Sequence, residues 1–290
     1  MAPSGPIGSG GVITFSDVTV QYPGQDAPAV ERFSLEAPSG KITVLLGSSG
    51  CGKTTLLQCV NQLVAPSSGT VTIDGRDVRE EKPTQLRRSI GYVLQHSGLL
   101  PHRTVADNIA TVLRLNGVKK SESRQRALQA AERVGLGPEL MSRFPNQLSG
   151  GQQQRVAVAR ALAPDPSILL MDEPFGAVDP IVRRWLQDQL LALQEDLAKT
   201  ILLVTHDVTE ALTLGDRIAL LQKGGELAQV GSPEELAMEP ANSFTERFMG
   251  VTRATLGVRR AADGRRFAVD DRGAFVGVLG PNNPGEMGAP

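Results

Sequence analysis

The chain has 290 residues, 40% of them apolar, and a formal charge of -1 at pH 7. This length exceeds one average domain and allows a sizeable core, whereas no apolar run approaches the roughly 20 residues that span a bilayer. The first 31 residues contain no Lys or Arg for a secretion signal, and the balanced charge gives no broad basic surface. We expect one large domain with an appendage, located in the cytoplasm, and no nucleic-acid partner.

The N-terminal region changes composition after residue 11. Residues 1–11 are rich in Gly, Pro and Ser, which predicts a mobile leader outside the fold. Val12–Phe15 and Val18–Val20 have the composition of two β-strands, and a Pro23-Gly24 turn follows them. These segments predict the start of an antiparallel β layer.

Three short apolar runs, Lys41–Leu46, Ser167–Met171 and Thr200–Val204, end in polar residues. Continuous apolar runs are typical of strands buried on both faces, so they predict a parallel core sheet. Ile218–Val230 predicts two further strands around Gly224-Gly225. Between the first two runs, helical spacing predicts one buried helix face formed by Ala127, Leu128, Ala131 and Val134. An inserted helical subdomain is therefore expected.

A Gly-rich loop, Gly47-Ser-Ser-Gly-Cys-Gly-Lys53-Thr54, follows the first apolar run and precedes a predicted helix. The glycines let backbone N–H groups approach phosphate oxygens, Lys53 reaches the β and γ phosphates, and Thr54 meets Mg²⁺. The helix N-terminus favours the same phosphates. We predict that the nucleotide-binding residues here are Gly47, Ser48, Ser49, Gly50, Cys51, Gly52, Lys53, Thr54 and Thr55.

The two cysteines, Cys51 and Cys59, are separated by about 12 Å of helix rise, which is too far for a disulfide. Cys51 lies near a helix N-terminus, where a thiol pKa falls, and we predict that alkylating it blocks nucleotide binding. The alternative is that Cys51 is only a small residue that fits the loop.

Leu148-Ser-Gly-Gly-Gln152 precedes the helical stretch Gln153–Leu162, so a hydroxyl and free amides lie at a positive helix end. A turn with Ser149 as the helix N-cap is the structural alternative.

Three polar residues follow the other two apolar runs. Asp172 and Glu173 end one strand at the carboxyl edge of the predicted sheet, where Asp172 suits Mg²⁺ and Glu173 can polarise an attacking water. His206 ends the next strand and can hydrogen-bond a γ phosphate, with Asp207 as a neighbour. A solvated acidic turn and a structural histidine are the alternatives.

Together these motifs resemble the nucleotide-binding subunits of ABC transporters over residues 12–250. The resemblance implies an α/β fold: a RecA-like P-loop NTPase core with an antiparallel β layer and an inserted α-helical subdomain at about residues 97–165. It also implies a head-to-tail homodimer that encloses two ATP molecules with Mg²⁺. In that dimer the signature residues act on the nucleotide of the other copy; they are Ser149, Gly150, Gly151 and Gln152.

The family pattern assigns roles to three further residues. Tyr22 would stack on adenine, Gln95 would link Mg²⁺ and water to the membrane partner, and Asp179 would be the acid of the dimer loop. Their structural alternatives are a β-edge aromatic, a polar strand end and a helix N-cap before Pro180. Val178 stands where Leu is common. The implied catalytic residues are Glu173, His206, Gln95 and Lys53, and the implied metal-binding residues are Thr54, Gln95 and Asp172.

Finer stretches resemble the ATPases of glycine betaine, carnitine and choline importers: Ile90–His102, Asp172–Pro180 and His206–Arg217. This implies an ATPase on the cytoplasmic face of the membrane, held there by permease subunits and served indirectly by an extracytoplasmic solute-binding protein. Polyamines, sulfate or amino acids are alternative cargoes, and an exporter is another alternative. A soluble ABC protein acting on DNA or ribosomes fits less well, because only 95 residues separate Lys53 from Ser149 and the chain has one cassette.

After Gly250 the chain is too short for a tandem CBS pair. Phe267–Leu279 resembles the strand-turn-strand end of one CBS repeat, which predicts a remnant or truncation in residues 251–290. A plain β-hairpin followed by a Pro- and Gly-rich tail, residues 280–290, is the alternative.

Overall fold

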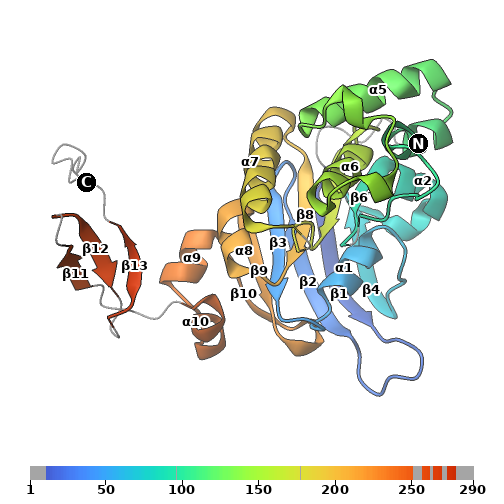
Figure 1. Ribbon diagram of the computed structural model, residues 1–290. Helices are drawn as coiled ribbons and strands as arrows, with labels where there is room; N and C mark the ends of the chain where they lie inside the picture. Colours follow the sequence, from blue (N-terminus) through green and yellow to red (C-terminus); the bar gives the residue numbers. More distant parts are fainter. Residues whose placement is uncertain are drawn as a thin grey trace.

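The computed structural model describes residues 11–95, 97–176, 178–250, 257–261, 264–269 and 273–278. A six-stranded sheet lies at the centre, with an antiparallel sheet on one side and helices on the other (Figure 1). This is the predicted P-loop fold with an antiparallel β layer and a helical insertion.

The central sheet has the strand order β10-β9-β3-β8-β7-β6. Strands β6 to β9 and β3 are parallel, and β10 pairs antiparallel with β9. Every residue of β3, β7 and β8 is buried, which confirms the prediction from their continuous apolar runs. The strands are β3 Ile42–Gly47, β6 Ile90–Val93, β7 Ile168–Asp172, β8 Thr200–Thr205, β9 Arg217–Leu221 and β10 Leu227–Gly231.

The antiparallel sheet has the order β2-β1-β4-β5, with β1 Ile13–Val20, β2 Val30–Ala37, β4 Ser68–Ile73 and β5 Arg76–Asp77. The predicted two strands at its start form one strand, β1, with a register shift between Phe15 and Val18. Asp17 takes φ 50° at that point, so the strand bends but does not end. Phe15 and Phe33 meet edge to face at 5.3 Å in the core beneath this sheet.

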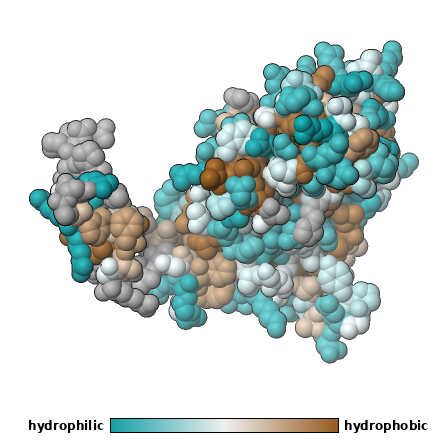
Figure 2. Space-filling model, in the orientation of Figure 1, coloured by the Kyte–Doolittle hydropathy of each residue, from teal (hydrophilic) through white to brown (hydrophobic). Residues whose placement is uncertain are grey.

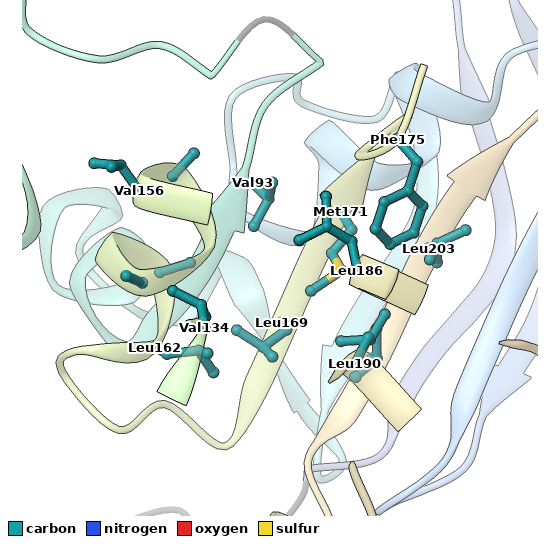
Figure 3. Close-up of a cluster of buried hydrophobic side chains, with 14 of the residues drawn as sticks. Val93, Val134, Val156, Leu162, Leu169, Met171, Phe175, Leu186, Leu190 and Leu203 are labelled. Carbon is teal, nitrogen blue, oxygen red and sulfur yellow. The ribbon is translucent and has the colours of Figure 1, made fainter. Parts of the chain in front are cut away.

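Helix α1, Lys53–Val60, packs against both sheets through residues that include Leu56 and Leu57. The opposite face of the central sheet is covered by a second apolar cluster (Figure 3). There Leu169 and Met171 of β7 meet Leu186 and Leu190 of α7. The remaining helices of the cassette are α2 Pro83–Ser89, α7 Pro180–Leu197, α8 Val208–Leu214, α9 Pro233–Met238 and α10 Ser243–Met249, with 3-10 turns at Val78–Glu80 and Lys223–Gly225.

Four helices occupy the inserted stretch: α3 Val105–Ile109, α4 Thr111–Leu115, α5 Lys120–Arg133 and α6 Gly150–Leu162, with 3-10 turns at Pro138–Leu140 and Pro145–Gln147. On α5 and its C-cap residue Val134, the predicted face is correct for Ala127, Ala131 and Val134 but wrong for Leu128, which is 42% exposed. Ala130 is buried in its place. Successive residues advance by about 100°, and the helix turns its row of small alanines toward the core, which leaves the larger leucine outside.

Three C-terminal strands form a sheet of their own, with β11 Gly257–Arg260, β12 Arg266–Val269 and β13 Phe275–Val278 in antiparallel order. Strands β12 and β13 pair antiparallel within the predicted Phe267–Leu279 stretch, which fits both the CBS-like interpretation and the plain hairpin, and β11 was not predicted. Val258 and Phe275 of this sheet are exposed. Figure 2 shows brown, hydrophobic surface on this part of the molecule. The expected leader, except Gly11, and the tail from residue 280 lie outside the described residues.

Candidate functional site

The loop between β3 and α1 depends on glycine for its path. Gly50 and Gly52 have φ of 79° and 102°, in the left-handed region that glycine occupies without strain. A Cβ on Gly52 would lie 2.8 Å from the carbonyl oxygen of Ala29, and one on Gly47 would lie 2.5 Å from that of Leu221. The backbone therefore passes where no side chain fits, with Ser48, Ser49 and Gly50 exposed.

Lys53 and Thr54 begin α1 beside this loop. Lys53 is 5% exposed, and its Nζ donates hydrogen bonds to the carbonyl oxygens of Gly47 at 2.7 Å and Ser48 at 2.9 Å. Thr54 Oγ1 donates to Oδ1 of Asp172 at 3.0 Å, which joins the first turn of α1 to the end of β7. An ammonium group, bare amides and a helix N-terminus thus meet at one place, and all three attract phosphate.

Asp172 is 6% exposed. Burial raises the pKa of its carboxyl, the Thr54 hydrogen bond and Lys53 oppose the rise, and the charge of Glu173 adds to it. The Thr54 hydroxyl and this carboxylate are oxygen ligands of the kind Mg²⁺ takes together with phosphate oxygens and water. Among the described residues, no group of three or more His, Cys, Asp or Glu side chains is placed to hold a metal. The Thr54 hydroxyl and the Asp172 carboxylate therefore fit a Mg²⁺ that also takes phosphate oxygens as ligands.

Glu173 meets two of the other predicted residues. Its Oε1 lies 3.1 Å from Nδ1 of His206, and its Oε2 accepts a hydrogen bond from Nε2 of Gln95 at 3.0 Å. Residue 173 has φ 43°, and its N–H donates to the carbonyl oxygen of Val204 on β8 at 2.9 Å. Three strand ends thus bring one carboxylate, one imidazole and one amide together.

Tyr22 lies beside α1, where its hydroxyl is 3.1 Å from Oγ1 of Thr55. The ring is partly buried against the apolar cluster below the antiparallel sheet. Thr55 itself is 9% exposed. The structure therefore brings these two predicted residues to each other, next to the loop.

Both cysteines are free, as the sequence indicates. Cys51 is 1% exposed and its Sγ lies 3.8 Å from Nζ of Lys53, while burial raises the pKa of Cys59 to about 12. A thiol enclosed in this way is out of reach of an alkylating reagent in the folded protein. The burial of Cys51 thus argues against the expectation that alkylation there blocks nucleotide binding, and supports the alternative that it is a small residue that fits the loop.

The Leu148–Gln152 motif forms a capping box at the start of α6. Ser149 Oγ accepts from the Gln152 N–H at 3.3 Å, and Gln152 Oε1 accepts from the Ser149 N–H at 3.0 Å. Gly150 begins the helix, and a Cβ on Gly151 would lie 2.9 Å from Cγ1 of Val182 on α7. The structural alternative for Ser149, a helix N-cap, is confirmed, which leaves a role in binding a second copy's nucleotide as a prediction.

Asp179 is the N-cap of α7, since its Oδ1 accepts from the Val182 N–H at 3.1 Å. Asp207 is the N-cap of α8, and its carboxylate forms an ion pair with Arg183 at 3.5 Å. Sequence reasoning missed Arg183 and Glu210, which contact Asp207 and Thr205, the two chain neighbours of His206. One feature of the sequence could have pointed to Glu210: it follows Asp207 by three residues, the spacing of an N-cap residue and an acidic residue in the first turn of a helix.

A parallel sheet with a phosphate-binding loop after its central strand, and acidic residues at the neighbouring strand ends, defines a P-loop nucleotide-binding protein. The sequence pattern of one family, ABC transporter, matches residues 30–176. The chain belongs to the ABC transporter family. None of the helices in the described part is both long and apolar enough to cross a membrane.

Curated relatives are similar over most of this chain. The osmoprotectant import ATP-binding protein OsmV of Salmonella typhimurium is 49% identical, over 81% of this chain and 61% of its own length. The glycine betaine uptake system ATP-binding protein YehX of Escherichia coli is 44% identical, over 82% of this chain and 77% of its own length. The sulfate/thiosulfate import ATP-binding protein CysA of Mycobacterium bovis is 46% identical, over 82% of this chain and 66% of its own length. The match to OsmV thus spans less than two thirds of that relative.

A solved structure supports the fold. The dimeric post-hydrolysis state of the ATP-binding cassette MJ0796, bound to ADP and Pi, superposes with a TM-score of 0.70 at 33% identity. The match covers 76% of this chain and 98% of that cassette.

Proposed function

We propose that this chain is the ATP-binding and ATP-hydrolysing subunit of an ABC importer for glycine betaine or a related quaternary amine. One observation supports the ATPase activity most directly: the Glu173 carboxylate lies between His206 and Gln95, on the strand end next to the Thr54–Asp172 hydrogen bond. Phosphoryl transfer depends mainly on positioning and charge stabilisation, and these groups can provide both.

Each residue then has a defined task toward ATP. Lys53 exchanges its bonds to the carbonyl oxygens of Gly47 and Ser48 for the β and γ phosphates. His206 holds the γ phosphate, and the Glu173 carboxylate accepts the proton of the attacking water. Mg²⁺, held by Thr54, Asp172 and Gln95 together with phosphate oxygens, would supply positive charge at the site of transfer.

The other predicted residues complete the nucleotide site. Tyr22 would stack on the adenine, and the amides between Gly47 and Thr55 would surround the phosphates. Ser149 to Gln152 and Asp179 would act from the second copy of a head-to-tail homodimer. The dimeric form of the MJ0796 cassette supports this arrangement.

The partners follow from the proposed role as an importer subunit. Permease subunits would hold the ATPase dimer at the cytoplasmic face of the membrane, and an extracytoplasmic solute-binding protein would deliver the cargo to them. The names of OsmV and YehX, osmoprotectant import and glycine betaine uptake, support a quaternary amine as that cargo. The similarity to CysA makes sulfate the second candidate cargo.

ATP hydrolysis by the purified protein tests the enzymatic part. Lys53→Ala should abolish nucleotide binding. Glu173→Gln should retain binding, accumulate an ATP-bound dimer and lower turnover by about 10² to 10⁴-fold, the usual contribution of a general base. Binding is measured with a fluorescent ATP analogue, and the dimer by gel filtration. Normal turnover in either variant would contradict the assigned roles.

Uptake of labelled glycine betaine at high osmolarity tests the cargo. Cells that lack this chain are supplied with wild type or with Glu173→Gln, and the same cells are assayed with labelled sulfate. Restoration of betaine uptake by wild type alone supports the proposal. Unchanged betaine uptake in the deletion strain, with a loss of sulfate uptake, would favour the second cargo.

A further inference from the structure

The loop that holds His206 is fixed from both sides by groups to which the proposed function gives no task. Thr205 precedes the histidine, and its Oγ1 donates to Oε2 of Glu210 at 2.7 Å. Asp207 follows it, and its N–H donates to the same Thr205 oxygen at 3.0 Å. Thr205 and Glu210 are 2% and 4% exposed, so this link lies inside the protein.

Arg183, the fourth residue of α7, contacts this arrangement from outside the loop. Its Nη1 lies 3.5 Å from Oδ2 of Asp207, and its Nε lies 3.9 Å from Oε1 of Glu210. The third nitrogen, Nη2, donates to the carbonyl oxygen of Val178 at 3.3 Å. Val178 directly precedes Asp179. A single guanidinium therefore touches both the His206 loop and the loop that ends at Asp179.

The charges in this cluster restrict how it can move. Burial raises the pKa of Glu210, and the negative charge of Asp207 raises it further. The hydrogen bond from Thr205 and the charges of Arg183 and His206 lower the same pKa. A buried carboxylate keeps its negative charge at low cost in free energy only while a positively charged partner stays close to it. The Nε of Arg183 is buried without a hydrogen bond of its own. A small shift of α7 would therefore alter the contacts of Glu210 directly.

We propose that Arg183 is a positioning residue that couples the Asp179 loop to the His206 loop through Asp207 and Glu210. The inference rests on the proposed function, in which Asp179 meets the second copy and His206 meets the γ phosphate. Contact of Asp179 with the partner cassette changes the start of α7, and Arg183 transmits that change to the loop on which His206 sits. Hydrolysis thereby depends on dimer closure through a chain of contacts within one subunit.

Three variants of the full chain separate positioning from mere stability. Arg183→Met leaves Glu210 buried without its cation, so both melting temperature and kcat should fall. Glu210→Gln keeps the Thr205 hydrogen bond but removes the charge that faces Arg183. The double variant Arg183→Met/Glu210→Gln removes both charges together, so its melting temperature should return close to wild type. If Arg183 positions His206, kcat of the double variant stays lower by about tenfold to a hundredfold with KM for ATP little changed.

Recovery of kcat along with the melting temperature in the double variant would overturn the inference, because it would show a structural ion pair only. Arg184→Met is the matched control, since Arg184 is the next residue on α7 and its side chain is exposed. It should match wild type in kcat, KM and melting temperature. Wild-type hydrolysis above that of Lys53→Ala tests the proposed function separately. Its absence would overturn that function and the inference with it, whereas hydrolysis with a recovered double variant overturns the inference alone.

Discussion

Glu173 and His206 directly follow the neighbouring parallel strands β7 and β8, and their side chains meet with Oε1 and Nδ1 3.1 Å apart. The main chain of Glu173 also donates to Val204, two residues before the histidine. The two residues are therefore joined through both backbone and side chain. A change at one of them should alter the orientation of the other.

The first prediction concerns His206. His206→Ala should lower ATP turnover by about 10²-fold, because the variant loses a hydrogen bond to the γ phosphate and the orientation of the Glu173 carboxylate. Affinity for ATP should change little, since Lys53 and the loop amides remain. Turnover and nucleotide binding are measured on the same preparation. His102→Ala, which alters an exposed histidine, is the control and should match wild type. Equal loss in both variants would contradict the assigned role.

The second prediction concerns the two thiols. Cys51 and Cys59 are 1% and 0% exposed, so neither should react with a thiol reagent in the folded protein. Both should react after unfolding in urea. Reaction is followed by absorbance of the released chromophore, with and without denaturant. Rapid labelling of Cys51 in the native protein, located by mass spectrometry, would show that the loop opens and would contradict this prediction.

The third prediction compares a glycine of strand β4 with a glycine of the turn between β4 and β5. Gly69 and Gly75 have nearly equal φ, 80° and 76°. A Cβ on Gly69 would lie 2.3 Å from the carbonyl oxygen of Asp17, whereas one on Gly75 would meet nothing within 4 Å. Gly75→Ala should cost about 1 to 2 kcal/mol for the left-handed backbone alone. Gly69→Ala should cost clearly more, since the backbone of β1 must also move. Urea unfolding measures both, and equal losses would contradict the close approach.

The fourth prediction concerns pH. The Arg114 hydrogen bond at 2.7 Å holds the pKa of Asp107 below its ordinary value of 3.8, although burial opposes this. Because the pKa of Asp107 is lower in the folded than in the unfolded protein, the ion pair stabilises the fold at any pH above the pKa of the unfolded state. This stabilisation is lost as the pH falls through the pKa of the folded state. Asp107→Asn should therefore reduce the free energy of unfolding at neutral pH and not at the acid end. The side chain is 41% exposed, so the loss should stay below about 1 kcal/mol.

Urea unfolding of wild type and Asp107→Asn from neutral pH down to about pH 4 and below, as far as the fold persists, measures this effect. In an Arg114→Met background the same substitution should lose most of its pH dependence, because the main partner of the Asp107 carboxylate is gone and only Thr104 and Arg103 still lower its pKa. A difference between Asp and Asn that stays constant over the whole range would assign the effect to something other than this ion pair.

The central sheet and the phosphate loop could be predicted from sequence because their signals are local. Continuous apolar runs such as Lys41–Leu46 indicate strands buried on both faces, and the loop motif follows one of them directly. Adjacent strand ends then suggested that Asp172, Glu173 and His206 lie together. The orientation of Leu128 could not be predicted, since small residues on neighbouring turns left two helix faces nearly equivalent.

Contacts between distant segments escaped prediction for a different reason. The bend of β1 at Asp17 accompanies the close approach of Gly69, more than fifty residues later in the chain. Arg183 and Glu210 come from two helices whose packing angle decides whether the side chains meet. Arg183 lies outside every motif and Glu210 has no assigned role in the His206–Arg217 stretch, so only the three-dimensional arrangement reveals their connection to His206.

The left-handed backbone of Glu173, with φ 43°, has a bearing on protein engineering. A residue other than glycine or asparagine in this conformation costs on the order of 1 to 3 kcal/mol. A screen for heat resistance would accordingly favour Gly or Asn at this position, and neither has a carboxylate that can accept a proton. At this one backbone position thermal tolerance and turnover are opposed, so variants selected for durability alone should be expected to lose their ATPase activity here.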